Sequence, residues 1–212
     1  RVSVHPPPER LAIFSMKRGK AMNKLALLSV SNKTGIVPFA QELINLNFDI
    51  LATGKTAQEI EAAQLPVSPV EEITGFPEIL GGRVKPLHPK ILGAILANPS
   101  DPSHRRDMDR YGIIPISLVV VNLYPFEEMM EAREEEELMR EFIDIGGVAL
   151  IRSAAKNYPN VAVVTDPKDY NWVIEKIKAF GELTPEERRI LAYKAFEHTA
   201  HYDATIASYF RS

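Results

Sequence analysis

The sequence contains no cysteine. It can therefore form no disulfide, no thiolate nucleophile and no cysteine-based zinc site. No apolar run approaches the roughly 20 residues that a membrane-spanning helix needs, so we expect a soluble, cytoplasmic protein. The formal net charge is only −3, which gives no global reason to expect a nucleic-acid or membrane partner. An anionic ligand would have to be bound by local positive groups.

What the sequence does have is enough apolar content for a core, with 45% hydrophobic residues in a chain of 212. Residues 1–23 differ from the rest because they contain three consecutive prolines and a cluster of basic residues. We interpret residues 1–23 as an extension, either flexible or of artificial origin, and residues 24–212 as one domain. A signal peptide is the alternative, but the apolar segment 11–14 is too short for one.

From residue 25 onward, short apolar runs alternate with amphipathic segments. This alternation predicts an α/β fold, a mainly parallel sheet with helices on both faces. We expect strands at 25–30, 48–52, near 67, 117–121 and 161–165, and helices at 36–46, 56–64 and 167–180. A long last helix should run from a capping box at Thr184 and Glu187 to about residue 210.

Hydroxyl-rich turns follow the first two predicted strands, at 29–35 and 53–56. Ligands of open parallel sheets bind outside the carboxyl ends of the strands, and helix N-termini attract phosphate. The two turns therefore predict a phosphate cradle that includes Lys33. The alternative is that these hydroxyls are ordinary helix N-caps. The spacing of a Walker loop is absent.

A loop at 74–89 is rich in glycine, proline and basic residues. Gly81 and Gly82 would let the backbone approach a ligand. Arg83 and Lys85, two apart in an extended stretch, would point the same way. A solvated surface loop is the alternative.

Two further segments carry candidate site residues. Tyr124 follows the fourth strand and precedes a proline, so it is a candidate for covering a heterocycle or simply an aromatic at the edge of the core. Asp144 precedes two glycines and a small-residue helical run that contains Lys156. The alternatives there are a plain N-cap and a complement to the helix dipole. His198 and His201 lack a third ligand at metal spacing.

Six segments, in this order, resemble the inosine monophosphate cyclohydrolase domains of bifunctional purine biosynthesis proteins, over about residues 24–210. They are Ser-Val-Ser-Asn-Lys-Thr-Gly at 29–35, Thr-Gly-Phe-Pro-Glu-Ile-Leu-Gly-Gly-Arg-Val-Lys at 74–85, Asn-Leu-Tyr-Pro-Phe at 122–126, Ile-Asp-Ile-Gly-Gly at 143–147, Arg-Ser-Ala-Ala-Lys-Asn at 152–157 and Lys-Ala-Phe-Glu-His-Thr-Ala-His-Tyr-Asp at 194–203.

The resemblance implies a methylglyoxal-synthase-like fold, a purine nucleotide substrate, a homodimer, and no metal or organic cofactor. It implies the dehydrative closure of formylaminoimidazole carboxamide ribotide to inosine monophosphate. Lys85 and Lys156 would stabilise an oxyanion and donate protons, Asp144 would accept a proton or pair with a lysine, and Tyr124 would position the imidazole. The implied substrate-binding residues are Ser29, Ser31, Lys33, Thr53, Gly54, Lys55, Thr56, Arg83, Asn122, Gly146 and Gly147.

The sequence departs from the family pattern in two ways. Lys55 and Pro86 stand where relatives usually have glycine and threonine, respectively. The close backbone approach expected at the glycine and the hydroxyl contact expected at the threonine are therefore left open for this chain. The family also usually continues into a folate-dependent transformylase domain, so we expect the cyclohydrolase step here without formyl transfer. A methylglyoxal-synthase-like phosphate lyase and a nucleotide-sensing regulatory domain are the rival functions.

The spacing of Asp144 and Lys156 leads to a geometric expectation. One uninterrupted helix would separate their α-carbons by about 18 Å, at 1.5 Å per residue. Both can contact one substrate only if the chain bends between them or a second subunit supplies one of them. We expect Asp144 on a loop, a helix that begins at or after Gly146, and a bend at Gly146 and Gly147, where glycine makes it least costly. The two residues should then line one pocket with Lys85 and Tyr124.

Overall fold

The computed structural model describes residues 23–82, 84–132 and 135–211. The predicted extension therefore lies outside the described residues except for Asn23, and so does Arg83. Five strands form one parallel sheet in the order β3-β2-β1-β4-β5. They are β1 (Lys24–Val30), β2 (Phe48–Ala52), β3 (Ser68–Pro69), β4 (Ile116–Asn122) and β5 (Ala162–Val164).

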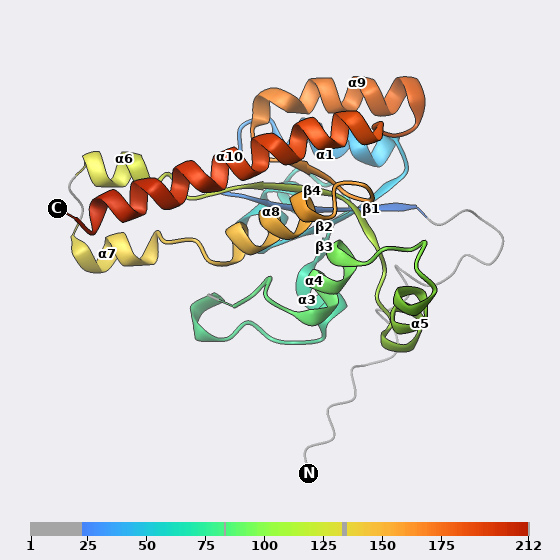
Figure 1. The fold of residues 1–212 in the computed structure, drawn as a ribbon, viewed down its shortest axis with the longest axis horizontal. Helices are drawn as coiled ribbons and strands as arrows, with labels where there is room; N and C mark the ends of the chain where they lie inside the picture. Colours follow the sequence, from blue (N-terminus) through green and yellow to red (C-terminus); the bar gives the residue numbers. More distant parts are fainter. Residues whose placement is uncertain (1–22, 83, 133–134, 212) are drawn as a thin grey trace, which may run out of the picture.

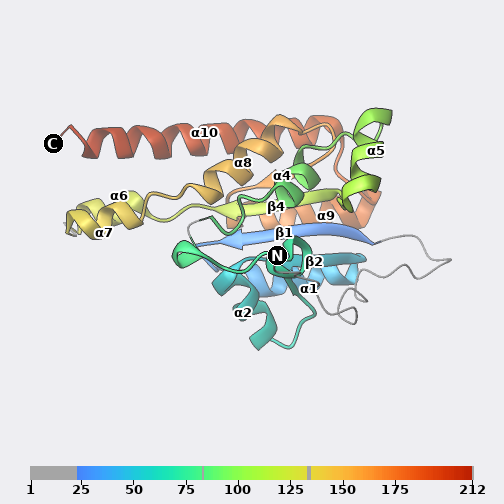
Figure 2. The same cartoon turned by 90° about the horizontal axis from the view of Figure 1, so that it is seen from below.

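Helices cover both faces of the sheet. Figure 2 shows α1 and α2 on one side of β1 and β2, and α4 and α8 on the other. Helix α9 packs on α1, whereas α10 packs on α8 and β5. The helices are α1 (Ile36–Asn45), α2 (Gly54–Ala62), α3 (Val70–Thr74), α4 (Pro89–Leu96), α5 (Pro102–Tyr111), α6 (Phe126–Glu131), α7 (Glu136–Glu141), α8 (Gly146–Lys156), α9 (Tyr170–Phe180) and α10 (Pro185–Tyr209), with short 3₁₀ turns at Leu80–Gly82 and Pro167–Asp169.

The core lies on both faces of the central strands. Leu27 of β1 pairs with Leu51 of β2 and Val119 of β4, and none of the three side chains reaches solvent. Burial on two faces explains why these strands read as continuous apolar runs rather than as alternating ones. The α/β fold with helices on both faces is confirmed.

Helix α10 runs along much of the molecule and ends beside α6 and α7 (Figure 1). The Thr184 hydroxyl accepts from the Glu187 amide, and the Glu187 carboxylate accepts from the Thr184 amide, so the predicted capping box is present. Leu191, Ala195 and Tyr202 are buried along the side that packs on α8 and β5. No helix among the described residues is long and apolar enough to cross a membrane.

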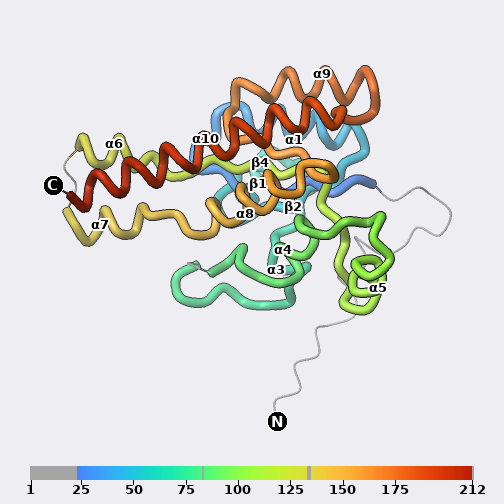
Figure 3. The backbone as a smooth tube through the Cα atoms, viewed as in Figure 1, coloured from blue at the N-terminus to red at the C-terminus, as the bar shows by residue number. Residues whose placement is uncertain are grey.

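The long connection between α3 and α4 is the least regular part of the described fold (Figure 3). It contains the glycine-rich and proline-rich loop that the sequence singled out. Its last segment leads into α4, which packs on α8. The loop therefore approaches the start of α8, whose first two residues are the two glycines, just after Asp144 and Ile145.

Candidate functional site

The turns that follow β1 and β2 meet, as neighbouring parallel strands require. The hydroxyl oxygens of Ser29 and Thr53 lie 2.6 Å apart. Thr56 has another role, because its buried hydroxyl accepts from the Val30 amide at 3.0 Å and donates to the Val30 carbonyl at 3.2 Å. Thr56 thus holds the end of β1 in place, while Ser29 and Thr53 lie side by side at the exit of the two strands.

The N-termini of α1 and α2 carry no side-chain cap. Gly35, in the left-handed conformation at φ +73°, precedes α1 and has no side chain to offer. Thr53 precedes α2, but its hydroxyl contacts Ser29 rather than the helix amides. The alternative that the Thr53 hydroxyl is an ordinary helix N-cap is therefore wrong. Two uncapped helix N-termini with a lysine at each, Lys33 and Lys55, form a favourable place for a phosphate group.

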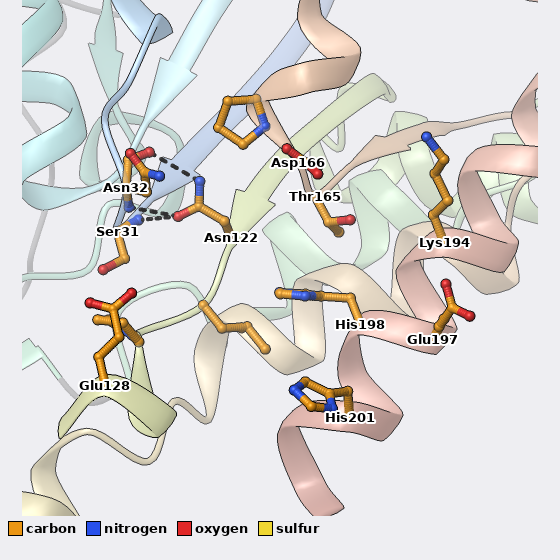
Figure 4. Close-up of a pocket in the computed structure, with 13 residues that line it drawn as sticks. Ser31, Asn32, Asn122, Glu128, Thr165, Asp166, Lys194, Glu197, His198 and His201 are labelled. Carbon is orange, nitrogen blue, oxygen red and sulfur yellow. Dashed lines mark hydrogen bonds between the residues drawn. The ribbon is translucent and has the colours of Figure 1, made fainter. Parts of the chain in front are cut away.

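Asn122 organises the turn after β1. Its side-chain oxygen accepts from the amides of Ser31 at 2.7 Å and Asn32 at 2.8 Å, and its amide donates back to the Asn32 carbonyl at 3.0 Å (Figure 4). Asn122 is buried. Lys33 folds over the same turn, and its ammonium donates to the carbonyls of Val30 and Ser31. Asn122 acts on the turn from the neighbouring strand, so its main contribution in this structure is to shape the turn.

Lys85 is held between two carboxylates. Its ammonium forms ion pairs with Glu71 and, at 2.7 Å, with Glu78. Burial lowers the pKa of Lys85, but the hydrogen bonds and charges of the two glutamates outweigh this effect and raise the pKa above its ordinary value. Lys85 therefore stays protonated at neutral pH. Neither glutamate was predicted as a partner of Lys85, although Glu78 lies within the loop at 74–89 and Glu71 lies just before it.

Three predicted segments converge at the start of α8. An ideal Cβ at Gly146 would lie 2.5 Å from Cγ of Pro86, the residue after Lys85. An ideal Cβ at Gly147 would lie 2.5 Å from Oδ2 of Asp144 and 2.9 Å from Cδ2 of Leu123, the residue before Tyr124. Glycine is needed at both positions because the neighbouring chains approach so closely.

The reason for these glycines differs from the one expected. Both residues belong to α8, and neither has a positive φ. The predicted bend at the glycine pair is therefore wrong in its location. The chain turns just before, at Asp144 and Ile145. The predictions that Asp144 lies outside the helix and that the helix begins at Gly146 are confirmed.

Asp144 lies just before this bend, with a partly buried carboxyl group. Its Oδ1 accepts from the Gly147 amide at 2.7 Å. Burial raises the pKa of Asp144, and the Gly147 hydrogen bond opposes this shift without cancelling it. A carboxyl group with a raised pKa at the meeting point of three loops is typical of a proton acceptor.

Tyr124 lies at the rim of the same region. Its side chain is 45% exposed, and its ring contacts that of Phe142 edge to face, with 5.9 Å between the centroids. One face of the phenol ring is thus supported by the segment that leads to Asp144, while much of the ring is open to a ligand.

Lys156 is placed differently. Helix α8 connects two parallel strands, so it begins near the carboxyl end of β4 and ends near the amino end of β5. Its 11 residues separate its two ends by about 15 Å. The residue after Lys156, Asn157, donates to carbonyls of Ile95 and Ala97 near the end of α4. Lys156 is exposed. The described chain brings the Lys85, Tyr124 and Asp144 segments together, but it does not bring Lys156 to them.

A cleft of about 690 Å³ opens beside this region, at the carboxyl ends of β1, β4 and β5. Figure 4 shows Ser31 and Asn122 on one side and residues of α10 on the other. The contribution of α10 to this cleft was not predicted from the sequence. His198 and His201 were considered only as metal ligands, although segment 194–203 was one of those that resemble the family. The other lining residues are Asn32, Leu123, Pro125, Glu128, Thr165, Asp166, Pro167, Lys194 and Glu197.

Several polar groups of this cleft already have partners within the chain. Lys194 pairs with Asp169 at 2.6 Å, and His201 lies 3.3 Å from Glu127. Burial lowers the pKa of His198, so its ring is neutral at neutral pH. Across the described ranges, no three histidine, aspartate or glutamate side chains are grouped as metal ligands.

Two family models match the chain. One, described as an MGS-like domain, matches residues 35–149. The other, described as the AICARFT/IMPCHase bienzyme, matches residues 154–212. Together they cover most of the sheet, the convergent loops and the last helix.

Curated relatives include the bifunctional purine biosynthesis proteins PurH of Persephonella marina, 48% identical over 187 residues, and of Prochlorococcus marinus, 52% identical over 192 residues. These matches cover 88% and 89% of the chain but 36% of each relative. The chain thus spans about a third of the length of these proteins. The crystal structure of ForH is similar with a TM-score of 0.78 and 37% identity, over 89% of this chain and 99% of that one.

Proposed function

The chain belongs to the family of MGS-like domains and is similar to part of the PurH proteins, and from this premise we propose that it is an inosine monophosphate cyclohydrolase. The reaction closes the last ring of the purine. The carboxamide nitrogen of formylaminoimidazole carboxamide ribotide attacks the formyl carbon, a carbon–nitrogen bond forms, and the formyl oxygen leaves as water.

The observation that carries the proposal is the convergence at the start of α8. The contacts of Pro86 with Gly146 and of Leu123 with Gly147 place the Lys85, Tyr124 and Asp144 segments around one point. The reaction needs a proton donor for the formyl oxygen and an acceptor for the amide proton, held on either side of the reacting groups. Lys85, kept protonated by its glutamates, is suited to the first role. Asp144, with its raised pKa, is suited to the second.

The ribotide phosphate would bind at the uncapped starts of α1 and α2. Ser29, Thr53 and the Gly54 backbone lie there, with Lys33 and Lys55 as cations. This site lies at the carboxyl ends of the same strands, so one extended nucleotide would reach from the phosphate site to the convergent loops. Tyr124 would cover its imidazole ring. The proposed role of Arg83 as an additional phosphate contact concerns a residue outside the described ranges.

Lys156 would complete the site from a second copy of the chain. The proposed role of Lys156 is to stabilise the negative charge that develops on the formyl oxygen. Because α8 places Lys156 and Asp144 at opposite ends, the proposal includes a homodimer in which Lys156 of one copy lies beside Asp144 of the other. The cytoplasmic location stays a prediction that accompanies this function.

The proposed function is tested with the purified chain and the formylated ribotide, followed by ultraviolet absorbance and by chromatography of the product. We expect formation of inosine monophosphate well above the uncatalysed rate, in metal-free buffer as in ordinary buffer. A rate equal to the uncatalysed one would refute the proposal. Release of inorganic phosphate from a triose phosphate, measured in parallel, would instead support the rival lyase function.

A further inference from the structure

We propose that Tyr202 of α10 is a positioning residue that holds Asp144 in the geometry needed to accept the amide proton. The inference rests on the proposed function, because it assigns Asp144 that role. In this proposal Tyr202 does not itself contact the reacting atoms. It acts on the turn that precedes α8, from a helix 58 residues further along the chain.

The contacts of the Tyr202 hydroxyl form a clamp. The hydroxyl accepts a hydrogen bond from the Asp144 amide at 2.8 Å and donates one to the Phe142 carbonyl at 2.7 Å. It thereby joins two backbone groups that lie two residues apart, just before the bend at Ile145. No secondary structure in the described chain satisfies these two groups, so the phenol takes the place of a backbone partner.

The phenol ring is itself fixed by packing. Tyr202 is 6% exposed, and its ring contacts that of Phe126 edge to face, with 6.3 Å between the centroids. Burial raises the pKa of the hydroxyl to about 12, so it is protonated at neutral pH and can donate and accept at once. The Tyr202 side of the clamp is thus held in place by packing.

The clamp determines which carboxylate oxygen of Asp144 is available. Tyr202 binds the backbone amide of Asp144, and the Gly147 amide binds Oδ1. Among the described residues nothing donates to Oδ2. With the backbone and one oxygen both held, Oδ2 is the atom left to take a proton from the substrate. A shift of the turn by about 1 Å is enough to cost on the order of a hundredfold in rate.

The variant Tyr202→Phe tests the proposal because it keeps the ring and removes only the hydroxyl. We expect kcat to fall by about ten- to a hundredfold, while KM for the ribotide stays within about twofold, because the phosphate contacts are untouched. The matched control is Tyr193→Phe on the same helix. It removes an exposed hydroxyl whose one hydrogen-bond partner among the described residues is Glu197, and it should leave kcat, KM and Tm unchanged.

Hydrogen exchange gives a readout that does not depend on activity. In the wild type the Asp144 amide should be protected, and in Tyr202→Phe the segment 142–147 should exchange faster than in the Tyr193→Phe control. A wild-type kcat in a folded Tyr202→Phe protein would overturn the proposal, and so would a rise in KM as large as the fall in kcat. If Tyr202→Phe does not fold, rapid exchange of the Asp144 amide in the wild type would overturn it. An inactive wild type with a protected Asp144 amide would refute the proposed cyclohydrolase instead.

Discussion

The ring of Pro86 occupies the space that a side chain at Gly146 would need, with only 2.5 Å between Cγ of the ring and an ideal Cβ at residue 146. This contact holds the loop of Lys85 against the first turn of α8, directly after Asp144. The helix starts with two glycines because two other chain segments lie against it. The arrangement of the site therefore depends on residue 146 being a glycine, which has no side chain.

Replacing Gly146 by alanine should destabilise the protein. A proline ring cannot rotate away, so overpacking costs about 1–3 kcal/mol. Residue 146 is the first residue of α8, so its gain in helix propensity is smaller than the roughly 1 kcal/mol of a helix interior and offsets only part of this cost. We expect a lower Tm, by about 2–4 °C for each kcal/mol of net loss, measured by circular dichroism. In the control Gly93→Ala, inside α4, the new Cβ would lie 3.2 Å from the flexible end of Ile113, and the full gain in propensity applies. Equal Tm values for the two variants would contradict the prediction.

Replacing Lys33 by alanine should weaken binding more than it slows turnover. A phosphate contact far from the reacting atoms contributes equally to the ground state and the transition state. We expect KM to rise by about ten- to a hundredfold, the range of a charged hydrogen bond, with kcat nearly unchanged. Steady-state kinetics would measure both. Lys178→Ala, which removes an exposed lysine of α9 paired with Glu42 of α1, is the control. A lower kcat at unchanged KM would rule out Lys33 as a phosphate anchor.

Replacing Asp144 by asparagine should separate stability from activity. Burial raises the pKa of Asp144, so the folded state binds this proton more tightly than the unfolded state does. The stabilising contribution is fully present below the ordinary value of 3.8 and is lost as pH rises through the raised pKa. At pH 7 the neutral amide of the variant carries no such penalty and can still accept from the Gly147 backbone. We expect unfolding free energies at least equal to wild type at pH 7, and kcat lower by about 10²–10⁴.

The unfolding free energies are measured by denaturant titration at a series of pH values. Asp101 provides a control whose pKa shift has the opposite sign to that of Asp144. Asp101 accepts hydrogen bonds from Ser103, chiefly from its hydroxyl, and these lower the pKa of Asp101. Its contribution is present above the ordinary pKa of 3.8 and lost as pH falls through the lowered one. Asp101→Asn should therefore be less stable than wild type at pH 7. The same pH dependence for both variants would show that Asp144 is not buried as described.

Replacing Lys156 by alanine should lower kcat by about 10²–10³, the usual effect of losing one group that stabilises an oxyanion. The dimer proposal adds a sharper expectation. Mixing Lys156→Ala with Asp144→Asn subunits should restore about a quarter of the wild-type activity, since half of the random dimers are mixed and each has one intact site of two. If each site uses its own Lys156, mixing would restore nothing.

The strands show how much of the fold local sequence patterns predict. The predicted strand at 48–52 matches β2 residue for residue, and the strand at 25–30 differs from β1 by one residue. Buried parallel strands are continuous apolar runs, and such runs are visible without any tertiary information. The helices α3 to α7 were not predicted, because they lie in a region rich in glycine, proline and charged residues.

The candidate site was predicted as a set of segments and not as a geometry. The turn hydroxyls, the basic loop and the acid before two glycines were all visible, because residues at the ends of parallel strands meet at one edge of the sheet. The partners of these residues were not visible. Glu71 and Glu78 beside Lys85, and Tyr202 beside Asp144, come from elements whose positions depend on the packed structure.

By itself, the sequence determined the alternation of strands and helices, the capping box of α10 and the family resemblance, since each depends on residues close together along the chain. Only the tertiary structure decided that Gly146 and Gly147 are needed for close approach rather than for a bend. The room for a side chain at a position depends on which atoms pack against it, and these atoms come from other parts of the chain. The tertiary structure also decided where α8 places Lys156. Because α8 is one straight segment between them, Asp144 and Lys156, 12 residues apart in the chain, lie at its two opposite ends.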